Sequence, residues 1–229
     1  MLLHLPDILD RDTVAHCRQL FEAADWVDGA LTAGRQSAQV KSNLQLPEHA
    51  TQIDELRQIV LDGLSRSAQF FSAALPQRIL PPLFNCYRDQ SNHFGQHVDN
   101  AVRSPAGSAE QVRTDLSATL FFSDPGEYDG GELVIEDTFG TQQIKLPAGH
   151  LVLYPSSSLH CVTPVTRGTR LGSFMWMQSM VRETERRRLL YEMDLAITGL
   201  RQCSLAADTP EVVRLTACYH NLLRMWAQV

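Results

Sequence analysis

The chain contains a spaced set of residues that could hold a metal ion: His97-Val98-Asp99, then His160, then Arg170. Two imidazoles and one carboxylate are the ligand set that binds Fe(II) on one face and leaves the opposite positions open for oxygen chemistry. The planar guanidinium of Arg170 could pair with the far carboxylate of an organic acid chelated to that metal. These residue types predict a metal, a class of co-substrate and an oxidative reaction together.

The H-x-D triplet alone is weak evidence, because roughly half of one such triplet is expected by chance in a chain of this composition. In a β-strand, residues two apart point to the same side, so His97 and Asp99 could both reach inward while Val98 faces away. The third ligand must then come from another strand, which His160 could supply. The triplet gains its weight from this extended setting and from the two residues that follow it.

The elements that must position these residues are short β-type runs between about Pro76 and Val181, separated by turn residues. Many short strands at close spacing favour an antiparallel sandwich or barrel over βαβ units. The polar segment 101–114 is predicted to be a loop that follows the His97 strand. The candidate strands are Leu83–Arg88, Phe94–Val98, Leu116–Phe122, Glu132–Glu136, Gln142–Lys145, Leu151–Tyr154 and Arg170–Gln178.

Amphipathic helices are expected before this β-rich region. Asp10 could cap a helix whose apolar stripe runs from Val14 to Ala24. A second stripe with helical spacing runs from Ile53 to Phe71, and the residues between the two, about 37–46, look extended. These helices most simply brace a sheet.

Helical spacing returns after the β-rich region. One stripe runs from Leu189 to Leu200, and Asp208 with Glu211 resembles a capping box at the start of another helix. Two such helices cannot bury their apolar faces within a hairpin, so they must pack on the β-core or on another copy of the chain. The predicted divisions are a domain over 1–181, with helices in 1–75 and a β-core in 76–181, and a helical hairpin over 182–229.

Length and composition are ordinary for a globular protein, at 229 residues with 44% hydrophobic and 20% charged residues. The net charge of −6 argues against a general affinity for nucleic acid or anionic membranes. The 5 cysteines form no C-x-x-C pair, and no stretch reads as a signal peptide or a bilayer span. We therefore expect a cytoplasmic protein without nucleic acid or membrane partners.

The motifs resemble those of the iron(II)/2-oxoglutarate-dependent dioxygenases, specifically the bacterial PKHD-type hydroxylases. The likeness is strongest from about Leu83 to Gln178, and the flanking helices look similar to the member described as an iron-uptake factor. The matching residues are Asn85-Cys86-Tyr87, His97-Val98-Asp99, Gly130-Gly131-Glu132-Leu133, the stretch from Pro147 to Pro155, His160, and the run from Arg170 to Gln178.

The resemblance implies an α+β fold, in which a double-stranded β-helix, or jelly roll, lies between N-terminal helices and a C-terminal helical hairpin. It implies that His97, Asp99 and His160 are the iron ligands. Arg170 would bind the distal carboxylate of 2-oxoglutarate, and Tyr87 would add its hydroxyl to the same carboxylate. The implied reaction consumes O2 and 2-oxoglutarate, hydroxylates an unidentified small-molecule or protein substrate, and releases succinate and CO2. Ascorbate (vitamin C) is suggested as an auxiliary cofactor by the same resemblance.

Two other function classes fit parts of the pattern. A cupin-like metalloenzyme of another reaction class would usually bind its metal through an H-x-H pair, which this chain lacks. Such an enzyme would also give Arg170 no evident role. A non-catalytic sensor of iron or 2-oxoglutarate would use the same ligand set, and sustained turnover would separate it from an enzyme. Association of copies through the C-terminal helices is a further expectation.

Several neighbouring residues have plain structural explanations. Phe174 and Trp176 are more typical of core packing than of substrate stacking, although Gly172 on the same strand face would leave room beside the co-substrate. The run 182–188 mixes arginines with glutamates and is typical of a solvated helix face. A helical zinc pair of His93 and His97 is disfavoured because the residues between them do not suit one. Segment 101–114 is as compatible with an ordinary surface loop as with a flap over substrate.

Overall fold

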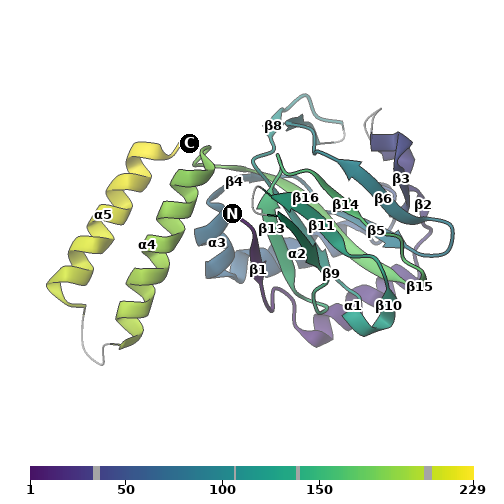
Figure 1. Cartoon of the computed structure of the whole chain (residues 1–229), viewed down its shortest axis with the longest axis horizontal. Helices are drawn as coiled ribbons and strands as arrows, with labels where there is room; N and C mark the ends of the chain where they lie inside the picture. Colours follow the sequence, from purple (N-terminus) through teal and green to yellow (C-terminus); the bar gives the residue numbers. More distant parts are fainter. Residues whose placement is uncertain (33–36, 106, 138–139, 204–207) are drawn as a thin grey trace.

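The computed structural model describes residues 1–229 except 33–36, 106, 138–139 and 204–207. A curled antiparallel β-core occupies one side of the molecule, helices cover one face of it, and a pair of helices projects from its end (Figure 1). This arrangement is the predicted α+β fold with a flanked β-core. No helix in the described ranges combines the length and hydropathy needed to cross a membrane.

The β-core is a sheet of 12 strands, among those described, that folds over at β3 (Lys41–Gln45). The first residues of β3 pair with one layer and its last residues pair with the other. The first layer runs through β1 (Leu3–Leu5), β13 (Leu151–Pro155), β9 (Leu116–Phe121), β16 (Arg170–Ser179) and β5 (Leu83–Tyr87). The second layer runs through β6 (Asn92–His97), β14 (His160–Val162), β11 (Leu133–Asp137) and β12 (Gly140–Ile144).

Short elements complete the core. Two of them extend the sheet, and the others form two-stranded ladders or single turns of 3-10 helix. The sheet extensions are β2 (Val27–Asp28) on β3 and β4 (Pro76–Ile79) on β16. The ladders join β7 (Val102–Arg103) to β8 (Val112–Arg113) and β10 (Tyr128–Asp129) to β15 (Arg167–Gly168). The 3-10 turns are Gly29–Thr32, Ser37–Gln39 and Pro125–Glu127.

Three helices brace the outer face of the first layer: α1 (Arg11–Glu22), α2 (Ile53–Arg66) and α3 (Ala68–Ala74). Asp10 caps α1 as predicted, because its side chain accepts a hydrogen bond of 2.8 Å from the Thr13 amide. Their apolar stripes pack against the outward side chains of the strands in one core cluster. Alternation along β16 therefore sends Met175 into this core and leaves its neighbours Phe174 and Trp176 for the interior of the jelly roll.

The predicted strands all exist, each with ends within two residues of the expected ones. The predicted second helix is two helices, because Ser67 adopts an extended conformation and its hydroxyl accepts a hydrogen bond from the Phe70 amide. The prediction of a plain loop over 101–114 is wrong in part, since β7 and β8 pair within it. Residue 106 of that segment lies outside the described residues.

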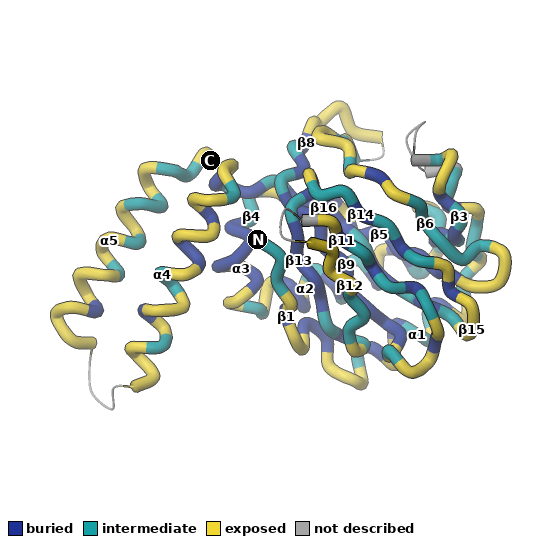
Figure 2. The backbone as a smooth tube through the Cα atoms, in the orientation of Figure 1, coloured by how far each residue is buried: buried dark blue, intermediate teal, exposed yellow. Residues whose placement is uncertain are grey.

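The C-terminal hairpin consists of α4 (Thr184–Cys203) and α5 (Pro210–Trp226), and much of its surface is exposed (Figure 2). It joins the body of the protein where Leu190 packs against Leu75 and Val181. The cap of α5 is Thr209, not the predicted Asp208, whose carboxylate pairs instead with Arg201 at 2.9 Å.

The prediction of a fully solvated face over 182–188 is wrong at Arg187. Its side chain is 2% exposed and its Nη1 atom donates to the backbone carbonyls of Val181 and Arg182. These carbonyls belong to the turn that leads from β16 into α4, so the guanidinium anchors the start of the hairpin.

Candidate metal centre

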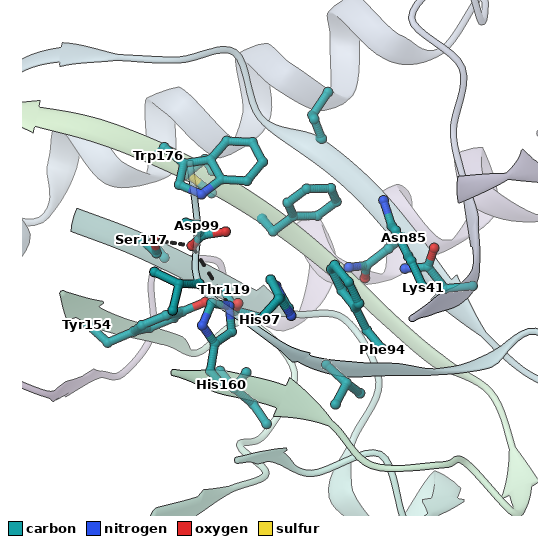
Figure 3. Close-up of a pocket in the computed structure, with 18 of the residues that line it drawn as sticks. Lys41, Asn85, Phe94, His97, Asp99, Ser117, Thr119, Tyr154, His160 and Trp176 are labelled. Atoms are coloured by element: carbon teal, nitrogen blue, oxygen red, sulfur yellow. Dashed lines mark hydrogen bonds and ion pairs between the residues drawn. The ribbon is translucent and has the colours of Figure 1, made fainter. Parts of the chain in front are cut away.

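The three predicted metal ligands meet at one end of the jelly roll, with their ligand atoms all within 4.8 Å of one another (Figure 3). His97 ends β6 and is directly paired with His160, which begins β14. Asp99 lies beyond the end of β6 and not within a strand, contrary to the expected strand setting of the triplet. Its Oδ2 atom is nevertheless 3.8 Å from Nε2 of His160.

Backbone carbonyls fix the orientation of both imidazoles. Nδ1 of His97 is 2.8 Å from the Gly95 oxygen, and Nδ1 of His160 is 3.0 Å from the Ser158 oxygen. A carbonyl oxygen only accepts hydrogen bonds, so Nδ1 carries a proton in each ring, and in the neutral ring Nε2 then presents its lone pair. This is the tautomer that a metal-binding histidine needs, and the carbonyls hold it in place.

The two imidazoles are also held by burial and ring contacts. His97 and His160 are 8% and 5% exposed, and their ring centroids are 4.2 Å apart. Phe94 stacks on His97 at 3.6 Å, and the Tyr154 ring meets His160 edge-on at 5.2 Å. Burial, and then the proximity of His160, lower the pKa of His97, which favours the neutral form that binds a metal.

A serine pair holds the carboxylate of Asp99. The Ser117 hydroxyl donates a hydrogen bond of 2.6 Å to Oδ2 of Asp99 (Figure 3). The hydroxyl of Ser156 lies 2.7 Å from that of Ser117. Both serines are buried. Ser117 belongs to β9 in the first layer, so this contact links the Asp99 loop to the strand across the cavity. The sequence analysis missed Ser117, and the available signal was its inward position on a predicted strand.

Arg170 lies deep in the interior, 1% exposed, where β16 pairs it directly with Tyr87 of β5. Its guanidinium carbon is 5.0 Å from the centroid of the Tyr87 ring and 5.2 Å from that of Phe121. Its Nε and Nη1 atoms have no hydrogen-bond partner among the described residues. A buried guanidinium with unsatisfied N–H groups is costly, so the site fits a carboxylate ligand.

Two glycines leave space around this guanidinium. A Cβ atom on Gly131 would lie 3.1 Å from Cδ of Arg170, and Gly131 also has a φ of +69° that favours glycine. A Cβ atom on Gly172 would lie 3.0 Å from Oδ1 of Asn85 and 3.5 Å from Nη1 of Arg170. The space at Gly172 agrees with the sequence expectation, whereas its use by a co-substrate stays a prediction.

One cavity between the two layers joins these parts. It is lined by the metal-ligand candidates, by Arg170 and Tyr87, and by side chains that the sequence analysis did not assign to a site, among them Lys41 and Arg103. Phe174 and Trp176 also line it, so the expectation of ordinary core packing is incomplete for them. His93 and His97 lie on a strand, which removes the helical zinc pair.

Two family models match the chain. The one described as "2OG-Fe(II) oxygenase superfamily" matches residues 82–178, and the one described as "PKHD-type hydroxylase C-terminal domain" matches residues 185–228. The chain is 58% identical to a PKHD-type hydroxylase of Xanthomonas campestris pv. campestris (strain B100), over 100% of both chains. It is 56% identical to a PKHD-type hydroxylase of Methylobacillus flagellatus, over 99% of both chains.

Solved structures share the fold at low sequence identity. A prolyl hydroxylase from Trichoplax adhaerens, in complex with a hypoxia inducible factor peptide fragment, aligns with a TM-score of 0.55 at 14% identity, over 82% of this chain and 86% of that chain. HygX from Streptomyces hygroscopicus with nickel and 2-oxoglutarate bound aligns with a TM-score of 0.53 at 12% identity, over 80% and 84%. These likenesses support the jelly-roll fold.

Proposed function

The chain belongs to the PKHD-type hydroxylases of the 2OG-Fe(II) oxygenase superfamily and is an Fe(II)- and 2-oxoglutarate-dependent dioxygenase, and we propose which of its residues carry that activity. His97, Asp99 and His160 bind the iron, and Arg170 with Tyr87 binds 2-oxoglutarate. Family membership disfavours both alternatives considered above, the cupin-like metalloenzyme and the non-catalytic sensor.

The observation that carries the iron assignment is the convergence of three ligand atoms within 4.8 Å from elements far apart in the sequence. Carbonyls of Gly95 and Ser158 already fix both imidazoles in the metal-binding tautomer, so little reorganisation accompanies binding. When bound, iron with 2-oxoglutarate supplies the oxidising chemistry, with succinate and CO2 as products.

The co-substrate assignment rests on the unsatisfied N–H groups of Arg170, which lines the same cavity as the metal-ligand candidates. A carboxylate there would accept from the guanidinium and from the Tyr87 hydroxyl, whose oxygen lies 3.4 Å from Nδ2 of Asn85. Arg170 thereby orients the acid along the cavity toward the histidines. Apolar walls that include Leu133 and Val162 keep water away from the bound acid.

The finer expectations belong to this proposal as well. We infer an unidentified small-molecule or protein substrate, assistance by ascorbate, and a cytoplasmic protein without nucleic acid or membrane partners. We also infer a catalytic domain over residues 1–181 and association of copies through the hairpin over 182–229. These inferences are supported by the composition and the family resemblance.

The central test is anaerobic addition of Fe(II) and 2-oxoglutarate, followed by oxygen. We expect a visible charge-transfer band before oxygen and succinate after it. Asp99→Ala should show neither, because one of three protein ligands is lost, whereas the exposed Asp25→Ala serves as a matched control that should behave like wild type. Absence of both band and succinate in the wild-type protein would refute the proposed function.

A further inference from the structure

Two cations and two aromatic rings form a continuous wall of the cavity, which we call the Arg103–Lys41 wall. The Arg103 guanidinium carbon lies 3.9 Å from the centroid of the Trp176 ring. Trp176 meets Phe174 edge-on with centroids 5.4 Å apart, and Nζ of Lys41 lies 5.6 Å from the Phe174 centroid. The four residues line the same cavity as the metal-ligand candidates, and Figure 3 shows Trp176 beside Asp99.

The wall carries two cationic side chains, and the acids whose charges act on them are Asp99 and Glu48 for Arg103 and Asp28 for Lys41. Asp99 is the one acidic residue among the described residues that line the cavity, and it is committed to the metal centre. Among the described residues, no ion pair within 4.0 Å involves Arg103, and Oε1 of Gln45 is one of the partners of Lys41, accepting from its Nζ at 3.0 Å. Burial, and then the charge of Arg103, lower the pKa of Lys41 to about 8.

The geometry of Arg103 suits an anionic ligand. A guanidinium that stacks on an indole keeps its N–H edges available for a carboxylate, which it can bind with two parallel hydrogen bonds. Arg103 is placed by the β7–β8 ladder, where it pairs with Val112. The rings of Trp176 and Phe174 offer an apolar surface between the two cations.

Neither carboxylate of 2-oxoglutarate requires the Arg103–Lys41 wall as a binding partner. Under the proposed function, on which this inference rests, Arg170 takes the distal carboxylate of 2-oxoglutarate and the metal takes the other end. We propose that the Arg103–Lys41 wall binds the hydroxylation substrate, and that this substrate is an organic anion whose carboxylate pairs with Arg103 while its apolar part lies on Trp176 and Phe174.

The test uses phenylacetate and phenylacetamide, which share a shape and differ in charge, as probes of the protein preloaded anaerobically with Fe(II) and 2-oxoglutarate. Tryptophan fluorescence and the charge-transfer band report binding, since Trp176 stacks against Arg103 and lines the same cavity as the metal-ligand candidates. We expect wild type to bind phenylacetate about ten-fold or more tightly than phenylacetamide. Arg103→Gln should lose that preference, and Arg103→Lys should keep part of it.

The matched control is Arg188→Gln, which removes the same charge from an exposed position on α4 and should bind both probes as wild type does. Equal affinity of wild type for the two probes, or undiminished phenylacetate binding by Arg103→Gln, would overturn the anionic-substrate inference and leave the proposed function standing. A wild-type protein without the charge-transfer band would overturn the proposed function and, with it, this inference.

Discussion

Replacement of Ser117 by alanine should weaken iron binding without touching a metal ligand. The Ser117 hydroxyl donates to Oδ2 of Asp99 over 2.6 Å, and Asp99 lies on a loop beyond β6 where no strand pairing fixes its carboxylate. A hydrogen bond to a charged group contributes about 1.5–3 kcal/mol, which corresponds to roughly 10- to 150-fold in affinity. Loss of a partner that orients a metal ligand typically costs about 10- to 100-fold.

The assay is an anaerobic titration of Fe(II) at saturating 2-oxoglutarate, followed through the charge-transfer band. Ser117→Ala should raise the Kd for iron by about 10- to 100-fold. Ser156→Ala is the matched control, because Ser156 contacts Ser117 and not the carboxylate itself, so we expect a smaller increase. Thermal unfolding of the metal-free variants separates this effect from a general loss of stability.

A folded Ser117→Ala that binds iron with the wild-type Kd would refute the role of the Ser117–Asp99 hydrogen bond in iron binding. The same conclusion follows if both serine variants weaken iron binding equally, because the effect would then come from the packing around the two serines and not from the hydrogen bond to Asp99 alone.

Three further predictions concern the rest of the molecule. Arg170→Ala should weaken 2-oxoglutarate binding by about ten-fold or more while leaving iron binding nearly unchanged, and unchanged affinity for 2-oxoglutarate in the same titration would contradict the role of Arg170. The pKa of Lys41 is about 8 in the folded chain and about 10.5 in the unfolded chain, so between these pH values the unfolded chain binds the proton that the folded chain has released. Raising the pH across this interval should therefore increase the free energy of unfolding of wild type relative to Lys41→Met by about 3 kcal/mol. Urea unfolding of both proteins across that interval measures this, and a difference independent of pH would count against it. A chain that ends at Val181 should lose any self-association seen by light scattering, and an unchanged oligomeric state would remove the hairpin as the contact.

The sequence could predict the parts of the fold that follow from local periodicity. Alternation along strands such as β16 and the Asp10 cap of α1 depend on residues close together in the chain, and both appear as expected. The clustering of His97, Asp99 and His160 was also predictable, because few residue types at such spacing bind a metal and the resemblance supplied their order.

Features that depend on distant contacts were not predictable. The inward position of Ser117 on a predicted strand does not name its partner, and its role depends on the hydrogen bond to Asp99, 18 residues earlier in the chain. Arg187 looked solvated among its charged neighbours, yet the turn after β16 brings two carbonyls against it. His4 and His150, whose ring nitrogens lie 2.8 Å apart, are 146 residues distant in sequence, so neither could be assigned a partner in advance.

The bend of the sheet at β3 sets the separation of the two layers that enclose the cavity. Among the described strands, β3 is the one that pairs with both layers, while the histidines stand on one layer and Arg170 on the other. Under the proposed assignment of Arg170, an acid held by both the metal and this guanidinium would span the gap between the two layers that β3 joins. A shorter or longer homologue of 2-oxoglutarate would have to pull the layers together or push them apart against a packed core. Under the same assignment, the bend of β3 would contribute to selection among such acids by chain length, together with the charge of Arg170.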